Sequence, residues 1–408
     1  MQSMQNKTKF HHLKTVFFYL CFGIVFMVLF SSCSVVKQPK TKWKLSACDT
    51  VELPFSGLHL VHTFYMPEYN TQVNTYFIYY PEVGHHGFIF CIDSIKPTVI
   101  FPVKTLIQNY FIEDTNTFIY QSSVSNLSKN NFLKRVNREG IVLDTLYFGF
   151  MGTLFGDTLN VCSTSTVISP PLNKTGSTHY YYSHISYPKF YHSMRDVDAR
   201  RRVLQRCPYV QKIAISKDSV TLTKQKYTHY PKAFFLEKAS YLSWLPHVVF
   251  NKNSDIITTY SYIDSLFVTH ANDNSQKHFS MKSRYKTKPI EPFDGTQRLD
   301  NVYCNEYSCR NISYGLLKYD SYQDCYYQIV SKPMPYENKD GTFNSPADKL
   351  WSLIIIDSDY KQVGEIKMPK YLDKHKIMIT PQGVAIQHKK LSEKKGTTVY
   401  VIYKFKKR

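Results

Sequence analysis

One pattern of strands and turns recurs along this chain from about Leu45 onward, and it constrains the fold more than any other feature. Each copy has an aromatic strand, a polar turn, a strongly apolar strand, a second turn and a third strand. The clearest copy has its strands at 325–330, 350–356 and 363–368. Recurrence at intervals of tens of residues predicts units that stack against copies of themselves.

The spacing of the copies predicts a circular array of sheets. Copies begin at five positions: Tyr76, Phe118, Ile256, Tyr326 and Val384. The long gap after the second has room for one or two degenerate copies, near 159–166 and 213–222. Units of about 40–50 residues that each form a four-stranded antiparallel sheet are typical of a β-propeller. We therefore expect an all-β fold, a six-bladed β-propeller, or a seven-bladed one if the gap holds two copies.

The composition and the last copy agree with this expectation. The chain has 33 Tyr and 27 Phe but only 15 Gly, and aromatic residues favour strands. Central strands such as 354–356 are apolar on both faces, as stacked sheets require. The last copy has only two strands, which predicts that residues 51–60 supply its outer strand and close the ring. The competing interpretation is a two-sheet sandwich followed by a smaller β domain.

The first 33 residues have the order of a lipoprotein signal. A stretch with three lysines precedes an apolar run of 15 residues at 16–30, which ends in Ser31, Ser32 and Cys33. A membrane-spanning helix needs roughly 20 apolar residues, whereas the apolar core of a signal has about 7–15. We therefore expect cleavage after Ser32 and acylation of Cys33. An uncleaved signal anchor is the alternative.

These features divide the chain into three parts. Residues 1–32 are the predicted signal peptide, with a signal helix, residues 33–44 a tether, and residues 45–408 the β-propeller domain. Stable anchoring needs more than one acyl chain, which an acylated N-terminal cysteine provides. Lipid on Cys33 would thus hold the protein in the outer membrane, on the periplasmic or the cell-surface side. The basic residues that follow Cys33 favour the periplasmic side.

The charge is strongly positive. Without the signal peptide, the chain has 48 basic and 31 acidic residues. The densest basic groups lie at 200–206, 389–395 and 404–408. Such charge attracts anionic lipid, acidic polysaccharide or nucleic acid. No nucleic-acid-binding module accompanies it, so we expect no nucleic acid partner and interpret the charge as a basic face near an anionic membrane.

Seven cysteines remain once Cys21 leaves with the signal and Cys33 is acylated. They are Cys48, Cys91, Cys162, Cys207, Cys304, Cys309 and Cys325. An odd number leaves at least one thiol unpaired. Cys91 lies in an apolar strand and predicts a buried thiol. An oxidising envelope permits a disulfide between Cys304 and Cys309, and their spacing argues against zinc.

Familiar catalytic and metal-binding motifs are missing from the sequence. It has no Gly-x-Ser-x-Gly, His-Glu-x-x-His or phosphate-loop motif. We interpret His85 and His86 as a solvated turn and not as metal ligands. We interpret Asp357 and Asp359 as turn residues and not as a calcium loop. We therefore expect no metal and no cofactor, while carboxylate pairs from distant loops stay open.

Two further patterns concern loops and modification. Ser193 is the predicted cap of a helix at 194–205, inside an irregular, tyrosine-rich insertion at 170–206, and long loops on a rigid scaffold often bind ligands. An aspartate followed by Ser or Thr and an aliphatic residue occurs at Asp49, Asp93, Asp144, Asp157, Asp218 and Asp264. This pattern resembles the O-glycosylation acceptor of Bacteroidota envelope proteins, but turn chemistry explains it equally well.

Several strand segments resemble one protein family. These segments are 250–262, 265–268, 280–285, 314–320 with 326–327, and 351–357. They resemble an uncharacterised Bacteroidota lipoprotein family, domain of unknown function 4221. The resemblance covers most of the chain after Cys33 and is firmest at 211–387. It implies an envelope lipoprotein with a propeller-like β fold, and no catalytic residues, because the family has none assigned.

The sequence therefore favours a binding function over an enzymatic one. We expect a monomeric, lipid-anchored protein that binds or scaffolds a glycan, a peptide or a partner protein. The alternative is a polysaccharide-active hydrolase or lyase with its site at the mouth of the propeller. Carboxylates or a histidine cluster converging at the centre would favour the enzyme, and a flat or purely aromatic face would favour binding.

Overall fold

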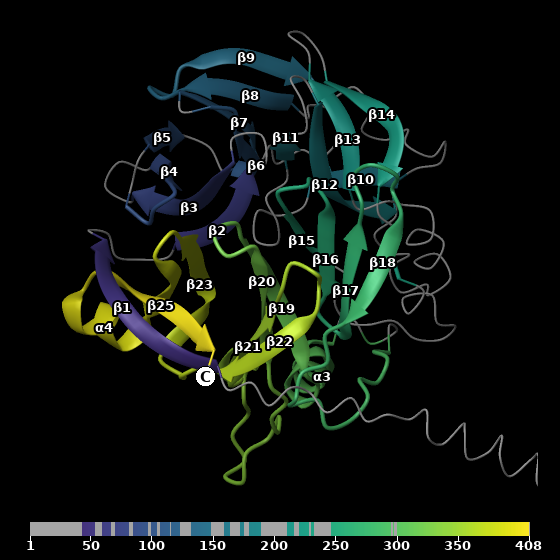
Figure 1. The fold of residues 1–408 in the computed structure, drawn as a ribbon, viewed down its shortest axis with the longest axis vertical. Coiled ribbons are helices and arrows are strands. Elements are labelled where there is room, and N and C mark those ends of the chain that lie inside the picture. Colours follow the sequence, from purple (N-terminus) through teal and green to yellow (C-terminus); the bar gives the residue numbers. More distant parts are fainter. Residues whose placement is uncertain are drawn as a thin grey trace, which may run out of the picture. The chain divides into compact units, whose positions relative to one another are not determined.

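A computed structural model describes most of the chain from Trp43 to Lys407 (Figure 1). The gaps are at 54–58, 67–69, 81–84, 97–98, 104–106, 115, 123–131, 148–158, 164–171, 175–178, 189–209, 216–219, 228–229, 232–245, 295–296 and 298–299. The predicted signal peptide, Cys33 and the predicted helix at 194–205 lie outside the described residues. So do Cys207, Asp157 and Asp218.

The described strands form six antiparallel sheets, each built mainly from strands that follow one another in the sequence. The first sheet contains β2 (His59–Met66), β3 (Thr71–Tyr80), β4 (His85–Ile92) and β5 (Val99–Val103). The second contains β6 (Ile107–Ile112), β7 (Thr117–Ser122), β8 (Phe132–Asn137) and β9 (Val142–Tyr147). The third contains β10 (Leu159–Ser163), β12 (His179–Pro188), β13 (Val210–Ile215) and β14 (Val220–Tyr227), with β11 (Leu172–Lys174) paired to β12.

The second half of the chain repeats this arrangement. The fourth sheet contains β15 (Pro246–Phe250), β16 (Ile256–Tyr260), β17 (Ile263–Thr269) and β18 (Gln276–Ser280). The fifth contains β19 (Ser313–Asp320), β20 (Cys325–Ser331), β21 (Trp351–Ile356) and β22 (Gln362–Lys367). The sixth contains β23 (Leu372–Thr380), β24 (Gly383–His388), β25 (Thr398–Lys407) and β1 (Trp43–Leu53). The expected all-β fold with four-stranded antiparallel sheets is confirmed.

The sixth sheet joins the two ends of the described chain. β1 pairs with β25 from Trp43 opposite Lys407 to Leu53 opposite Thr398. An N-terminal outer strand was expected at 51–60, but it lies earlier, because Leu45, Val51 and Leu53 are the residues that pack into the cores. It takes in the last two residues of the predicted tether. The sequence analysis also missed β23, whose apolar pattern is interrupted by charged residues at 373–376.

The first strands of four sheets contact one another and are called here the inner strands. They are β2, β15, β19 and β23. β2 contacts β15, β19 and β23, and β19 also contacts β15 and β23. Side chains of the inner strands therefore meet between sheets that are far apart in sequence.

The core lies between sheets that pack face to face. One cluster joins the fifth and sixth sheets through Ile329, Leu353 and Ile379, and another joins the fourth and fifth sheets through Ile257 and Ile354. Every residue of β16, β20 and β21 is buried. This confirms that the central strands are apolar on both faces, as packing between two neighbours requires. Each fully buried aliphatic side chain contributes about 1.5–3 kcal/mol.

Turns and long connections lie at opposite ends of the strands. In the fourth and fifth sheets the short turns at 251–255, 270–275, 321–324 and 357–361 are at one end, called the turn end. Antiparallel pairing puts the long connections, 281–312 and 332–350, at the other end, called the loop end. At the turn end, Ser321 Oγ donates to Gln72 Oε1 at 3.0 Å, and Tyr322 donates to Asp93. These bonds fix the first sheet to the fifth.

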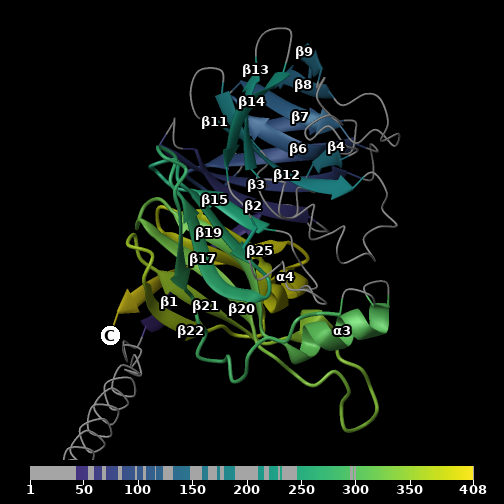
Figure 2. The same cartoon turned by 90° about the vertical axis from the view of Figure 1, so that its right-hand side faces the viewer.

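Two helices and a 3₁₀ turn lie on the loop-end connections. α3 (Asn301–Arg310) begins at Asp300, whose Oδ1 accepts from Val302 N and Tyr303 N. It contacts the 3₁₀ turn η5 (Pro346–Asp348), and Figure 2 shows it outside the strands of the sheets. α4 (Lys389–Lys395) connects β24 to β25. In the described part of the chain, no helix has the length and apolar character needed to cross a membrane.

Candidate functional site

β23 contains a bulge that carries a group of charged side chains. In the pairing of β23 with β24, Leu372 lies opposite His388 and Ile377 lies opposite Ile386. An advance of five residues along β23 therefore corresponds to only two residues along β24. The residues between are Asp373, Lys374, His375 and Lys376. A bulge redirects side chains and is common beside functional sites. Here it places three basic residues on an inner strand.

Another inner strand, β19, also carries a basic residue, Lys318. Its side chain is only 5% exposed. Among the described residues, no oxygen accepts a hydrogen bond from its ammonium group. Burial lowers the pKa of Lys318 to about 8, so the group is still mostly protonated at pH 7. A buried charge without a partner is costly.

The inner strand β15 carries a further basic residue, His247. Its Nδ1 atom is buried and has no hydrogen-bond partner in the described part of the chain. Burial, together with the positive charges of Lys318 and His375, lowers the pKa of His247 to about 4. The imidazole is therefore neutral at pH 7. Because charges on β19 and β23 act on a ring on β15, these side chains lie around one interior region.

We call His247, Lys318, His375 and Lys376 the inner-strand cluster. Burial lowers the pKa of Lys376 to about 8, and the carboxylate of Asp373 opposes this shift. Burial and the charge of Lys374 also lower the pKa of His375. The cluster thus sets two ammonium groups and two imidazoles against one nearby carboxylate. The side chain of His375 is exposed, so this member of the cluster is accessible to solvent.

The chemistry of the cluster suits an anion. Its two lysines carry positive charge and its imidazoles can donate hydrogen bonds, and charge-assisted bonds to carboxylate, sulfate or phosphate are strong. It is poorly suited to a metal ion. Among the described residues, no three His, Cys, Asp or Glu side chains form a group that could hold one.

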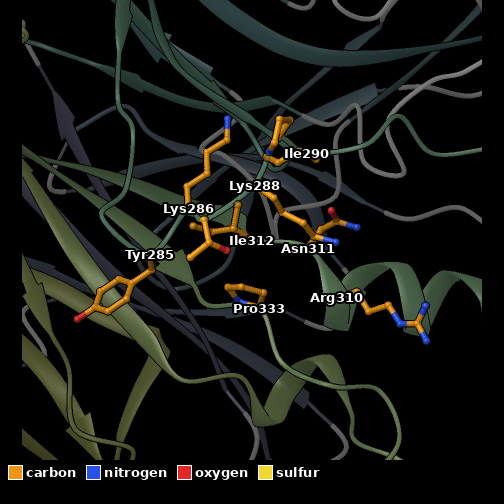
Figure 3. A pocket seen from close by; sticks show the side chains of 10 residues that line it. Tyr285, Lys286, Lys288, Ile290, Arg310, Asn311, Ile312 and Pro333 are labelled. Carbon is orange, nitrogen blue, oxygen red and sulfur yellow. The ribbon is translucent and has the colours of Figure 1, made fainter. Parts of the chain in front are cut away.

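A shallow basic pocket lies at the loop end (Figure 3). It is a surface depression, and the empty space of about 220 Å³ around it includes open solvent. Its lining combines the segment 285–290, the junction of α3 and β19 at 310–312, and Pro333. Figure 3 shows Arg310 at the end of α3, with Lys286 and Lys288 on the segment before the helix.

The three basic residues of this pocket differ in their partners. Lys286 Nζ lies 2.6 Å from Asp264 Oδ2, and Arg310 lies 2.6 Å from Glu306 one helical turn earlier. Lys288 is exposed and has no ion-pair partner in the described part of the chain. Tyr285 lies beneath a further cation, because Lys332 Nζ is 3.4 Å from the centroid of its ring. The pocket therefore keeps a positive charge.

The histidine and aspartate interpretations had different outcomes. His85 and His86 do not form a turn. They begin β4 and lie opposite Tyr80 and Tyr79 of β3. Asp357 is a turn residue as predicted. Its Oδ1 accepts from Asp359 N at 3.1 Å and from Lys361 N at 2.8 Å.

The cysteine interpretations divide in the same way. Cys91 is fully buried, as predicted. Cys304 and Cys309 both lie on α3 and neither is in a disulfide, so the permitted bridge is not formed. Five residues apart on a helix, the two side chains point in different directions. Cys48 and Cys325 are not in a disulfide either.

Four of the six modification motifs fall on described residues. Thr50 and Thr145 follow Asp49 and Asp144 and are exposed. The residues that follow Asp93 and Asp264 are partly buried.

The sequence analysis did not identify the inner-strand cluster. A signal was present, because Lys318 is a charged residue in a strand of mostly apolar and aromatic residues, and the neighbouring strand β20 is buried throughout. A lysine in that setting is either at an edge or part of a site. The segment 373–376 gave no such signal, because its charged residues interrupt the apolar pattern by which β23 would be predicted as a strand.

Comparisons with known proteins agree with the resemblance in sequence. The family model described as "Domain of unknown function (DUF4221)" matches residues 165–367. The crystal structure of a DUF4221 family member from Bacteroides vulgatus has a TM-score of 0.68 at 18% identity, over 91% of this chain and 100% of that chain. The resemblance is thus confirmed, and at this identity the structural match shows the fold alone.

Other solved structures are less similar. A putative exported protein from Bacteroides fragilis has a TM-score of 0.44 at 7% identity, over 91% of this chain and 97% of that chain. The WD40 repeats of RRP9 give 0.39 at 9% identity, over 88% and 100%. No curated protein matches the chain.

Proposed function

We propose that this chain is a lipid-anchored envelope protein whose sheets form a six-bladed β-propeller and whose inner-strand cluster binds an anionic ligand. Several observations support a closed ring. Consecutive four-stranded sheets pack face to face, their first strands contact one another, and β1 completes the last sheet beside β25. A propeller has these three properties.

The anchor in this proposal is Cys33. The order of basic stretch, apolar run, small residues and cysteine supports cleavage after Ser32, with acyl chains then inserted in the outer membrane. Metabolic labelling with a clickable palmitate analogue should mark the wild-type protein and not Cys33→Ser. Labelling of both proteins, or of neither, would remove the anchor from the proposal. The described domain begins ten residues later, so binding can be tested separately.

The binding role depends on one observation: Lys318 is only 5% exposed, and its ammonium group has no acceptor among the described residues. Folding has placed this charge where water cannot fully solvate it and no described side chain compensates it. An anion bound beside it would supply the missing partner. The proposed ligand is a glycan, a peptide or a partner protein that presents a carboxylate, sulfate or phosphate group.

Sulfate is a suitable probe because its charge does not change near neutral pH. Titration calorimetry should detect sulfate binding to the wild-type protein, and a saturating concentration should stabilise the fold. At a concentration of 100 times Kd the gain is about 2.7 kcal/mol. Lys318→Met should abolish both effects. Lys277→Met, an exposed lysine at the turn end of β18, serves as the matched control. Equal sulfate binding by Lys318→Met would contradict the proposal.

One observation also favours a lyase acting on an acidic polysaccharide. A neutral imidazole, His247, and a cation, Lys318, belong to the same cluster. Elimination beside a carboxylate needs a base to remove a proton and a positive charge to stabilise the resulting anion. Incubation with polygalacturonate should then produce unsaturated sugars, detected by ultraviolet absorbance. A binding protein would leave the polymer intact.

A further inference from the structure

Basic side chains continue from the inner-strand cluster toward the loop end. Lys374 is next to His375 in the β23 bulge, and its Nζ donates to Ser331 Oγ at 3.3 Å and to Pro346 O at 3.4 Å. These acceptors are at the end of β20 and in η5, on the connection 332–350. The bulge is thereby tied to the same connection that contributes Pro333 to the basic pocket.

Lys349 is the next buried basic residue between the bulge and the pocket. Its Nζ donates to Ser308 O at 2.7 Å and to Asn311 O at 2.6 Å, at the C-terminal end of α3. Burial lowers the pKa of Lys349 to about 7, and the charge of Lys374 adds to this shift, so the two ammonium groups are neighbours. Asn311 itself lines the basic pocket. Hydrogen bonds of Lys374 and Lys349, whose charges interact, therefore connect the β23 bulge with a residue that lines the pocket.

This pocket is both basic and partly apolar. Lys288 and Arg310 extend toward solvent, while Ile290, Ile312 and Pro333 supply apolar surface. The nearby carboxylates of Asp264 and Glu306 are already paired. Cations beside apolar surface fit a sugar ring, which has apolar C–H faces and, in acidic sugars, a charged substituent. A polyphosphate chain would use the charges and leave the apolar surface exposed.

We propose that the ligand is an acidic oligosaccharide long enough to place one charged sugar at the inner-strand cluster and another in the basic pocket. This inference rests on the proposed function, because it takes the cluster as the first contact. It adds a second contact at the loop end and a chain-length requirement. Two linked contacts bind more tightly than either alone, because the second forms at a high local concentration.

A length series tests the inference. Oligogalacturonates from the monosaccharide to the dodecamer would be titrated into the intact protein by calorimetry. Affinity should rise with length until both contacts are reached and then level off. The double variant Lys288→Gln, Arg310→Gln should weaken binding of the longest chain about tenfold, as the loss of two exposed charged contacts allows. It should leave binding of the monosaccharide unchanged. Lys277→Gln should have no effect on either ligand.

The outcomes separate this inference from the proposed function. If Lys318→Met abolishes binding of every length but affinity does not depend on length, the cluster is the site and the second contact is wrong. If Lys318→Met has no effect on the monosaccharide, the proposed function fails. Tighter binding of a polyphosphate of matched charge than of the dodecamer would overturn the assignment to a sugar. The double variant changes only exposed side chains and Lys318→Met changes a buried one, and circular dichroism would confirm that both proteins fold.

Discussion

Lys318 and Lys349 are buried to the same degree, at 5% and 4% exposed, but only Lys349 has acceptors for its ammonium protons. Lys349 donates to two main-chain oxygens and, at 3.3 Å, to Ser313 Oγ. It joins the end of α3 to the start of β19. Lys318 joins nothing in the described part of the chain. Although the two lysines are equally buried, we infer that Lys349 stabilises the fold and that Lys318 binds a ligand.

This contrast predicts opposite effects on stability. Lys349→Met should lower the free energy of unfolding by about 1–3 kcal/mol, because buried carbonyl oxygens lose their donor. Lys318→Met should leave it unchanged or raise it by about 1–2 kcal/mol, because a buried charge without a partner is removed. Urea unfolding measures both. Loss of stability in Lys318→Met comparable to that in Lys349→Met would show that Lys318 has a structural role.

Sulfate affinity should depend on pH in one direction. The pKa values of Lys318 and Lys376 are each about 8, lowered by burial, and the anion binds their protonated forms. Affinity should therefore be full below about pH 7 and fall as pH rises through 8. Asp373, Lys374 and His375 also face this region, so the midpoint belongs to the group. His247, with a pKa of about 4, adds no step between pH 6 and 9. Calorimetry at several pH values checks this, and an affinity constant to pH 9 would contradict it.

In the absence of an anion, stability should depend on pH in the opposite direction. The folded-state pKa of Lys318 is below its unfolded value of 10.5, so the unfolded chain binds more protons between these values. The free energy of unfolding should rise with pH from about 7 to 9, before tyrosine ionisation begins. Lys349, with a pKa of about 7, adds to the same trend. Urea unfolding of the wild-type protein and Lys318→Met across this range should show a shallower slope in the variant. Identical slopes would count against a charged, buried Lys318.

The turn between β23 and β24 should tolerate no side chain at Gly383. Its φ is +143°, and an added Cβ would overlap the main-chain oxygen of Tyr403 on β25. Gly383→Ala should therefore cost more than about 2 kcal/mol in urea unfolding. Gly341→Ala is the matched control, because its φ is +79° but no atom lies within 4 Å of the added Cβ. It should cost about 1 kcal/mol. Equal effects would mean that contact with Tyr403 is unimportant.

The pairing of β1 with β25 should be essential to the sixth sheet. Leu53 is 1% exposed and packs with Tyr76 and Tyr400. Leu53→Ala should lower the free energy of unfolding by about 2–4 kcal/mol. Lys44→Ala, an exposed position on the same strand, should change it by less than about 0.5 kcal/mol. A Leu53→Ala protein as stable as Lys44→Ala would show that β1 is only loosely attached.

Strand patterns predicted the class of fold because packing between two neighbouring sheets demands it. The run Leu353 to Ile356 is apolar on both faces and lies in the middle of a sheet, as expected. β1 was placed too late, because its sequence alternates weakly and its partner is more than 340 residues away. α3 was missed because its polar and apolar residues are not sorted onto separate faces.

The candidate site could not be predicted, because it depends on a register irregularity and on contacts between sheets. Nothing in the residues 373–376 reveals that Leu372 and Ile377 are only two steps apart on the partner strand. Likewise, His247 and Lys318 are 71 positions apart and become neighbours only when their strands meet. Hydrophobic patterns predict which residues form the core. They do not predict buried polar residues that serve a site and not the hydrogen bonding of the main chain.

The partner of β1 is the last strand of the chain. A ribosome must therefore translate more than 340 further residues before β1 can pair. Until then that edge of the strand stays open. Any truncation before Thr398 would release a molecule with an unpaired strand, ready to aggregate or to be degraded. The sixth sheet can therefore form only after β25 has been synthesised.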